Sequence, residues 1–258
     1  MPRFDANLSM LFTEVDFLDR FAAAAAAGFA GVEYVSPYDY DPDILARQLA
    51  DNGLSQVLFN LPVGDWDAGE RGLAILPDRV AEFRSGAETA VAYAKALGCK
   101  QVNCLAGIVP NGTNLAVLRE TFIENLKFTA DLFEKDDIKL LIEPINPIDI
   151  PGFYLNSSRQ ALDLIEAVES DNLYLQYDIY HMQIVEGDLA RTIEAALPRI
   201  AHIQIADNPG RHEPGSGEIN YPFLFDHLDR IGYQGWVGCE YRPSATTAES
   251  FGWMPGQS

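Results

Sequence analysis

Short apolar runs recur about every 30 residues along this chain, and segments with the pattern of amphipathic helices separate them. Parallel strands need a crossover of a dozen or more residues, so this spacing fits parallel strands joined by helices. Eight such runs predict a single (β/α)8 barrel, the TIM barrel fold, and 258 residues agree with the about 250 typical of that fold. The runs are Phe4–Phe12, Val32–Val35, Ser55–Leu61, Gln101–Ala106, Lys139–Glu143, Leu173–Ile179, Ile200–Ala206 and Trp236–Tyr241.

Residues that favour helix ends lie between the runs. Asp41, followed by proline, opens one predicted helix, and Gly53 closes it. Gly98 ends another helix, Ser157 precedes one, and Pro198 ends one. No linker or low-complexity stretch divides the chain, so we expect one domain over residues 1–258.

The end of the chain has no clear pattern. We expect a short irregular tail over about residues 243–258, in which Phe251 and Trp253 pack against the barrel.

The charge balance narrows the class of partner. The chain has 18 basic and 38 acidic residues, and its formal net charge is −20. Nucleic acids and anionic membranes attract basic surfaces, so we expect neither as a partner. A small-molecule substrate fits this composition better.

The sequence carries no signal for export or membrane insertion. No run approaches the roughly 20 apolar residues that span a bilayer. The alanine-rich stretch 22–27 follows acidic residues instead of a basic segment, and Gly28 stops it as a helix C-cap would. We therefore expect a cytoplasmic protein, with reduced and buried thiols at Cys99, Cys104 and Cys239.

Four polar residues interrupt four successive apolar runs near their C-terminal ends: Glu143, Asp178, Gln204 and Glu240. Side chains alternate along a strand, and Asp178, Gln204 and Glu240 lie opposite the aliphatic face that should meet the helices. They should therefore point into the barrel, at the end where TIM-barrel enzymes carry their active sites.

Three carboxylates in one dry site need a counter-charge, because isolated buried carboxylates are strongly disfavoured. The cationic residues nearest these strands, Arg199 and Arg242, lie at strand ends and could pair with only some of them. A divalent cation is the simplest alternative. Oxygen ligands suit Mg²⁺ or Mn²⁺ better than Zn²⁺. We predict a metal site formed by these carboxylates and Gln204.

Other polar residues follow the same strands. His181 comes just after Asp178, where it is a structural residue or, beside a metal site, a hydrogen-bond donor to substrate. Arg211, in the loop after Gln204, either lies in solvent or binds a substrate carboxylate through two N–H groups of its planar guanidinium. Arg71, in the loop after the third run, is a weaker candidate for that role. No glycine-rich phosphate loop follows a strand, so a nucleotide cofactor is unsupported.

Several segments together resemble the hydroxypyruvate isomerase family, within the xylose-isomerase-like TIM barrel group, along almost the whole chain. The matching segments are NLSMLF (7–12), NLPVGDWDAGERG (60–72), LIEPINPIDIPGF (141–153), QYDIYHMQ (176–183), HIQIADNPGRHEPGSGEINY (202–221) and GWVGCEY (235–241).

This resemblance implies a divalent metal held by Glu143, Asp178, Gln204 and Glu240. It also implies that Glu143 and Glu240 are the proton donor and acceptor, with an enediolate between two proton transfers. Asp178, His181 and Arg211 match substrate-contacting positions in related ketose epimerases. Those epimerases have histidine at the position of Gln204, so the glutamine favours the isomerase branch. The family also makes a homo-dimer or homo-tetramer an expectation.

Five alternatives stay open. A sister branch isomerises 2-oxo-tetronates, and ketose 3-epimerases share the scaffold. A lyase or dehydratase could use the same enediolate chemistry. A barrel endonuclease would need more than the four histidines present and a basic groove. A non-catalytic sugar-acid binding protein could keep Arg211 but would not need two facing glutamates.

Overall fold

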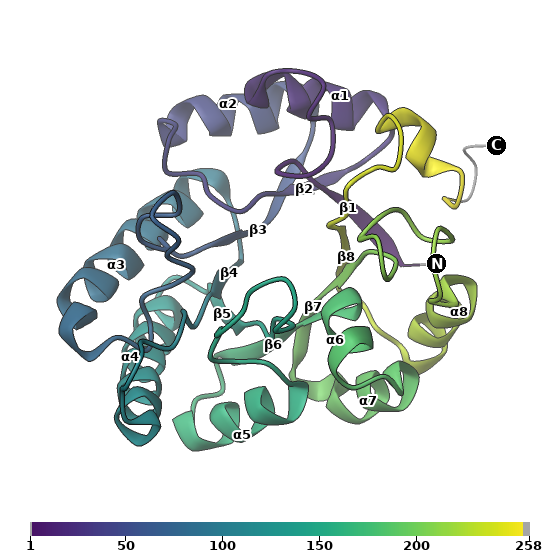
Figure 1. The fold of residues 1–258 in the computed structure, drawn as a ribbon. Coiled ribbons are helices and arrows are strands. Elements are labelled where there is room, and N and C mark those ends of the chain that lie inside the picture. Colours follow the sequence, from purple (N-terminus) through teal and green to yellow (C-terminus); the bar gives the residue numbers. More distant parts are fainter. Residues whose placement is uncertain (1, 255–258) are drawn as a thin grey trace.

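The computed structural model describes residues 2–254, which form a closed barrel of eight parallel strands in the order β1 to β8 (Figure 1). Each strand pairs with its neighbours in sequence, and β8 closes the barrel by pairing with β1. The single TIM barrel predicted from the apolar runs is therefore confirmed. The strands are β1 (Arg3–Asn7), β2 (Gly31–Glu33), β3 (Ser55–Asn60), β4 (Gln101–Cys104), β5 (Lys139–Ile142), β6 (Leu173–Asp178), β7 (Ile200–Ile205) and β8 (Trp236–Cys239).

Helices surround the barrel as an outer ring (Figure 1). The α-helices are α1 (Arg20–Ala26), α2 (Pro42–Asn52), α3 (Val80–Leu97), α4 (Leu115–Glu134), α5 (Ser158–Val168), α6 (Ile179–Val185), α7 (Leu189–Ala196) and α8 (Tyr221–Ile231). Short 3-10 helices cover Phe17–Asp19, Pro77–Arg79, Leu197–Arg199 and Ala248–Phe251. None of the helices in the described residues is long and apolar enough to cross a membrane.

Helix ends lie where the capping residues predicted them. The Asp41 side chain accepts a hydrogen bond from the backbone N–H of Asp43, and Gly53 ends the same helix with φ of 65°. Ser157 caps α5 through the backbone N–H of Gln160. Gly98 follows α3 with φ of 66°. These local signals fix the helices that hold the strands in place.

The predicted first strand, Phe4–Phe12, is wrong at its end, because β1 stops at Asn7. The Asn7 carboxamide oxygen accepts from the backbone N–H of Ser9, and the Asn7 carbonyl accepts from that of Leu11. These bonds turn the chain out of the strand. The other predicted strands overlap the observed ones, with ends one or two residues away.

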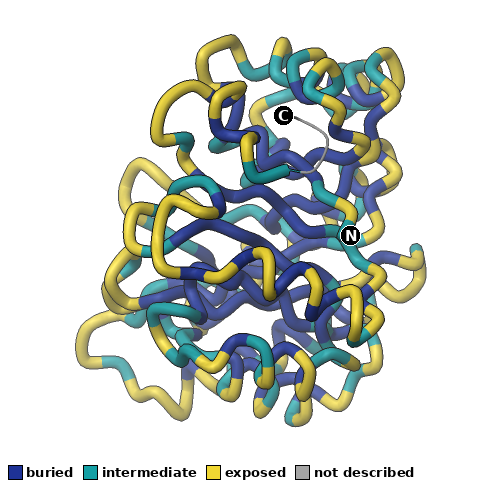
Figure 2. Tube along the Cα trace, turned by 90° about the vertical axis from the view of Figure 1, so that its right-hand side faces the viewer, coloured by how far each residue is buried: buried dark blue, intermediate teal, exposed yellow. Residues whose placement is uncertain are grey.

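Strand register places the polar positions side by side. Asp178 of β6 pairs with Gln204 of β7, and Gln204 pairs with Gly238 of β8. Glu143 and Glu240 are the first residues after β5 and β8. Figure 2 shows the buried strands through the middle of the molecule, with exposed loops and helix faces outside. Four predicted site residues therefore lie at the C-terminal end of a buried barrel.

The described part of the tail packs on the barrel. Phe251 is buried against Phe12 and Phe29, and Trp253 lies edge-on to Phe4 with ring centroids 5.0 Å apart. Residues 255–258 of the predicted tail lie outside the described residues. The three cysteines are buried and unpaired with one another, as predicted.

Candidate active site

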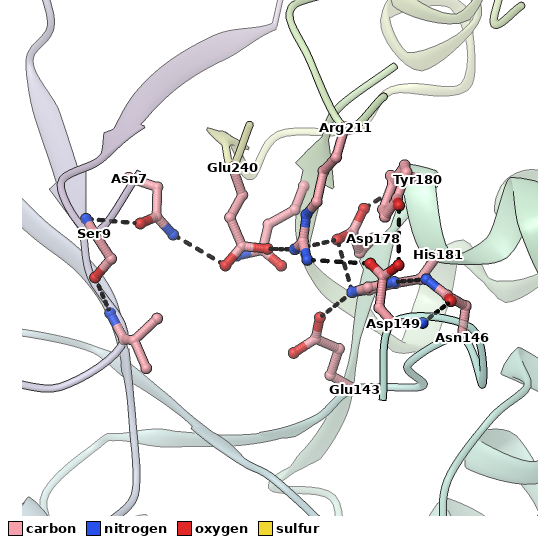
Figure 3. A network of polar contacts seen from close by, with 12 residues as sticks. Asn7, Ser9, Glu143, Asn146, Asp149, Asp178, Tyr180, His181, Arg211 and Glu240 are labelled. Atoms are coloured by element: carbon pink, nitrogen blue, oxygen red, sulfur yellow. Dashed lines mark hydrogen bonds and ion pairs between the residues drawn. The ribbon is translucent and has the colours of Figure 1, made fainter. Parts of the chain in front are cut away.

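Carboxyl groups from three strands converge at the C-terminal end of the barrel (Figure 3). Glu143, Asp178 and Glu240 are all buried, and Asp178 is the most deeply enclosed of the three. His181 joins them from the first turn of α6, three residues after Asp178. The structure thus brings together three of the four predicted metal ligands and two predicted substrate-binding residues, His181 and Arg211.

Asp178 uses its two oxygens differently. Oδ1 caps α6 by accepting from the backbone N–H of Tyr180 at 2.8 Å. Oδ2 is buried and has no hydrogen-bond partner in residues 2–254; His181 Nε2 lies 3.5 Å from it. Potential ligand atoms of Glu143, Asp178 and His181 all lie within 4.8 Å of one another. A buried acceptor without a donor, beside a second carboxyl group, fits a divalent cation.

Asn146 determines which nitrogen of His181 carries the proton. The Asn146 oxygen accepts from the backbone N–H groups of Ile148 and Asp149, so its amide nitrogen faces His181. That amide lies 2.6 Å from His181 Nδ1, which must then be the acceptor. Burial also lowers the pKa of His181 well below its usual value. A neutral His181 therefore has its proton on Nε2, facing the carboxylates, and is a donor there.

Arg211 is the cation that lies among the carboxylates. Its Nη2 is 2.6 Å from Glu240 Oε2 and 3.7 Å from Asp178 Oδ2, and its Nη1 is 3.5 Å from Asp149. The guanidinium also lies 5.1 Å from the centroid of the Tyr180 ring. The sequence did not predict this pairing with the carboxylates, because Arg211 lies far from these strand ends along the chain.

The two arginines that lie nearest in sequence, Arg199 and Arg242, have no ion pair with the cluster in the described residues. Arg199 lies 3.9 Å from exposed Asp171, and Arg242 contributes a backbone N–H to the Arg211 carbonyl at 2.8 Å. Long-range folding of the β7 loop, which no local spacing encodes, brings Arg211 back over the barrel.

Asp207 organises the loop that carries Arg211. Its carboxylate accepts from the backbone N–H groups of Asn208, Gly215 and Ile219. Arg211 has φ of 54°, a left-handed conformation that costs a non-glycine residue energy unless its surroundings impose it. The Asp207 contacts close the loop, and this closure holds the guanidinium over the carboxylates.

Burial and like charge shift the pKa values of the three carboxyl groups upward. Burial, with Glu240 and Asp178 nearby, raises the pKa of Glu143 well above its usual value. Burial raises the pKa of Glu240 to about 8, although Arg211 opposes the shift. Burial raises the pKa of Asp178 to about 6, again against Arg211. One guanidinium therefore does not balance these acids, and protons or a cation must do so.

The side chains of Gln204 and Arg71 form no hydrogen bond with those of Glu143, Asp178 or Glu240 in residues 2–254. The Gln204 amide nitrogen donates to Glu33, and its oxygen accepts from Gln176. The Arg71 guanidinium stacks 3.6 Å from the Trp66 ring centroid and donates to the carbonyls of Trp66 and Glu70. Gln204 still neighbours Asp178 in strand register, whereas Arg71 contacts its own loop.

A large cavity opens among the loops at the C-terminal end of the barrel. It has a volume of about 1150 Å³ and lies between the loops that follow β1, β2, β3 and β8, with Ser9, Trp66 and Arg242 in its wall. Glu143, Asp178 and Glu240 do not line it, but Ser9 connects to Glu240 through Asn7, as Figure 3 shows. Hydrogen bonds therefore link the wall of this cavity to the carboxyl groups.

Several buried residues that hold the site were not predicted from the sequence. Asn103 donates to Glu143 at 3.0 Å, and Asn7 donates to both Glu240 and Glu33. Asn146, which orients His181, was also missed. Glu33 could have been found, because it interrupts the apolar run GVEYV in the same way as the four predicted residues. The asparagines carry no comparable signal.

Comparisons with known proteins agree with this architecture. A family model described as xylose isomerase-like TIM barrel matches residues 21–256. Hydroxypyruvate isomerase of Escherichia coli K12 is 55% identical over 254 residues, covering 98% of each chain. A 2-oxo-tetronate isomerase of Pectobacterium atrosepticum is 49% identical, covering 98% of this chain and 97% of that one. A crystal structure of a protein named AP endonuclease, family 2, from Brucella melitensis superposes with a TM-score of 0.96 at 47% identity and covers 98% of each chain.

The raised carboxyl pKa values predict a pH-dependent stability in chelated protein. The pKa of Glu240 is about 8 in the folded chain but near 4.5 when unfolded, so between these values the folded state holds a proton that the unfolded chain has lost. This stabilisation is complete below pH 4.5 and disappears as the pH rises through 8. The melting temperature of the chelated protein should fall by several degrees across this range.

Added Mn²⁺ should reverse that fall, because a cation replaces the protons that the carboxyl groups lose. Glu240→Gln should flatten the pH dependence, whereas Glu134→Gln, on the exposed end of α4, should leave it unchanged. Differential scanning fluorimetry across the pH series measures both. A melting temperature independent of pH and of Mn²⁺ would contradict the account of a carboxylate site for a cation.

Proposed function

The chain belongs to the xylose isomerase-like TIM barrel family and is an isomerase of that family, and we propose that it interconverts hydroxypyruvate and tartronate semialdehyde (2-hydroxy-3-oxopropanoate). The observation that carries this proposal is the pair of buried glutamates, Glu143 and Glu240, beside Asp178 and His181 (Figure 3). Two carboxyl groups with raised pKa values suit two proton transfers near neutral pH.

A divalent cation, Mg²⁺ or Mn²⁺, is part of the proposal. Glu143, Asp178, Gln204 and Glu240 would hold it, and the buried Asp178 Oδ2, which accepts no hydrogen bond in residues 2–254, supports this fit. When bound, the cation polarises the substrate carbonyl and makes the neighbouring C–H more acidic. The donor set is rich in oxygen, which favours these ions over Zn²⁺.

The two glutamates move the proton. One carboxylate removes a proton from C3 of hydroxypyruvate, and the electron pair forms the C2–C3 double bond of an enediolate. The other glutamate, in its protonated form, delivers a proton to C2. The proton of the C3 hydroxyl passes to the C2 oxygen, so that C3 becomes the aldehyde and C2 the carbinol. No atom is gained or lost.

Arg211 and His181 would hold the substrate. The Arg211 guanidinium lies over the site and offers a planar pair of N–H donors to a carboxylate. It must give up its bond to Glu240 to do so, and its contact with Asp149 keeps it near. His181 would donate from Nε2 to a substrate oxygen. Arg71 is a further candidate, since its loop borders the cavity through Trp66.

The sister substrate, a 2-oxo-tetronate, is the second candidate, and the relatives give a specific reason for it. The 2-oxo-tetronate isomerase relative is 49% identical to this chain, against 55% for the hydroxypyruvate isomerase relative. Glutamine at position 204 weighs against a ketose 3-epimerase. A net charge of −20 weighs against a DNA substrate, which the name of the Brucella protein suggests for that protein.

The oligomeric state and the location stay predictions. We expect a homo-dimer or homo-tetramer in the cytoplasm, acting on a small hydroxy or oxo acid without nucleic acid or membrane as partner.

Glu143→Gln and Glu240→Gln distinguish an enzyme from a sugar-acid binding protein. Each removes one proton-transfer group, and kcat should fall by about 10²- to 10⁴-fold, the range for general acid–base catalysis. A coupled assay of hydroxypyruvate isomerisation measures kcat, with Glu134→Gln as the matched surface control. A binder would instead keep its affinity for the acid in both variants.

The substrate assignment is tested by comparing turnover of hydroxypyruvate with turnover of 2-dehydrotetronate in Mn²⁺- or Mg²⁺-loaded enzyme, with chelated enzyme as control. We expect chelator-sensitive formation of tartronate semialdehyde, with the higher kcat/KM for hydroxypyruvate. A higher kcat/KM for the four-carbon acid would assign the chain to the sister branch. Loaded enzyme inactive on both acids would contradict the proposed reaction.

A further inference from the structure

A second polar layer lies inside the barrel beneath the carboxylates. Glu33 at the end of β2 contacts Asn7 of β1 and both His202 and Gln204 of β7. All four side chains are buried, with at most 2% of their surface exposed. The proposed reaction gives Glu33 no task, although a carboxylate buried this deeply is disfavoured unless it is fully paired.

Three side-chain nitrogens face the Glu33 carboxylate. Oε1 lies 2.9 Å from Asn7 Nδ2 and 2.8 Å from Gln204 Nε2, and Oε2 lies 2.6 Å from His202 Nε2. A carboxylate only accepts hydrogen bonds, so it fixes which end of each amide faces it. The two carboxamides must both turn their nitrogens toward Glu33 and their oxygens away.

Asp5 of β1 is the other acid in this layer. Potential ligand atoms of Asp5, Glu33 and His202 lie within 4.8 Å of one another. Burial, with Glu33 nearby, raises the pKa of Asp5 well above its usual value, whereas the contacts with His202 and the two amides lower that of Glu33 against its burial. Three side-chain nitrogens also face Glu33, whereas no side-chain nitrogen donates to Asp5 in residues 2–254, so the negative charge of this layer lies on Glu33.

For Gln204 the orientation of the amide matters at the site. With its nitrogen on Glu33, its oxygen lies on the β6 side, where it accepts from Gln176 at 2.6 Å. Asp178 is the residue of β6 that pairs with Gln204. A carboxamide binds Mg²⁺ or Mn²⁺ through its oxygen and not through its nitrogen, so a flipped amide would present the wrong atom.

For Asn7 the same contact sets up a second bond. Its amide nitrogen has two protons; one is directed to Glu33 and the other to Glu240 Oε1, at 3.1 Å. The Asn7 oxygen accepts from the Ser9 backbone N–H, which agrees with this orientation. Glu33 thus bonds directly to the amide of Gln204, and it is linked to the proposed catalytic Glu240 through Asn7.

Gly238 of β8, which has no side chain, leaves space for the Glu33 carboxylate inside the barrel. A Cβ atom built on Gly238 would lie 2.6 Å from each Glu33 oxygen, far inside van der Waals contact. Gly238 is also the β8 residue that pairs with Gln204. Glu33 therefore reaches across a gap that a side chain on β8 would close.

We propose that Glu33 is a positioning residue, which orients the amides of Gln204 and Asn7 so that Gln204 presents its oxygen to β6, the strand of Asp178, and Asn7 donates to Glu240. In this proposal Glu33 acts through the two amides and is not itself a ligand of the cation at Glu143, Asp178 and Glu240. This inference rests on the proposed metal-assisted function, and extends it to a residue one layer deeper in the barrel.

Two substitutions of Glu33 test the proposal, with the affinity for Mn²⁺ alone, measured by isothermal titration calorimetry, as the readout. Glu33→Gln keeps the size of the side chain but replaces one accepting oxygen with an NH2 group, which cannot accept a hydrogen bond from Asn7, His202 or Gln204. Glu33→Asp keeps the charge but withdraws the carboxylate by one methylene. Both should weaken Mn²⁺ binding by about 10- to 100-fold, the range for residues that orient metal ligands.

Glu186→Gln and Glu186→Asp are the matched controls, because Glu186 is also a glutamate with an accepting carboxylate. Its oxygens accept from the backbone N–H and the hydroxyl of Ser158, at the start of α5. No hydrogen bond joins Glu186 to Asn7 or Gln204 in residues 2–254, so both variants should keep wild-type affinity. Melting curves of the chelated proteins verify that each variant is folded at the assay temperature. If Glu33→Gln fails to fold, Glu33→Asp still decides the question.

The outcomes separate this inference from the proposed function. A wild-type affinity for Mn²⁺ in Glu33→Asp would show that only the charge of Glu33 matters, and it would overturn the positioning role. A wild-type affinity for Mn²⁺ in Glu33→Gln would overturn that role as well. Weakened Mn²⁺ binding in both variants, with no turnover of either acid by the loaded wild type, would keep positioning and refute the substrate assignment. Wild type that binds no Mn²⁺ would refute both.

Discussion

The repulsion between buried carboxyl groups is the constraint on which this site depends. Glu143, Asp178 and Glu240 meet at the end of the barrel, largely out of contact with water, and one guanidinium lies among them. Burial and mutual repulsion raise the carboxyl pKa values in consequence. Relief of this repulsion requires protons or a divalent cation, and the proposed reaction uses both.

The barrel supplies the rigidity that this arrangement requires. The three carboxyl groups come from different strands, so their mutual positions depend on strand register and not on a flexible loop. Asparagine side chains then fix individual atoms: Asn103 bonds to Glu143, Asn7 to Glu240 and Asn146 to His181. Arg211 differs, because it reaches the site from the loop held by Asp207. A loop residue can give up Glu240 to a substrate carboxylate, whereas strand residues stay in place.

Much of this architecture could be predicted from the sequence, because local patterns encode it. Strand periodicity, helix caps at Asp41 and Ser157, and the interruption of apolar runs by acids depend on neighbours in the chain. The predicted end of β1 was wrong because the turn at Asn7 depends on side-chain bonds that hydrophobicity does not reveal. The pairing of Arg211 with Glu240, and the roles of the asparagines, depend on contacts between distant residues. Glu33 interrupts an apolar run as the four predicted residues do, but its contacts with Asn7, His202 and Gln204 join strands that are distant in the sequence.

The central claim is that the convergent carboxyl groups bind a divalent cation. Anomalous diffraction from crystals of the wild-type protein grown with Mn²⁺ tests it most directly. We predict one strong anomalous peak for an Mn²⁺ ion that is coordinated by Glu143, Asp178, Gln204 and Glu240, with Arg211 displaced from Glu240. A well-ordered site without a peak, in which Arg211 still pairs with Glu240, would contradict the account.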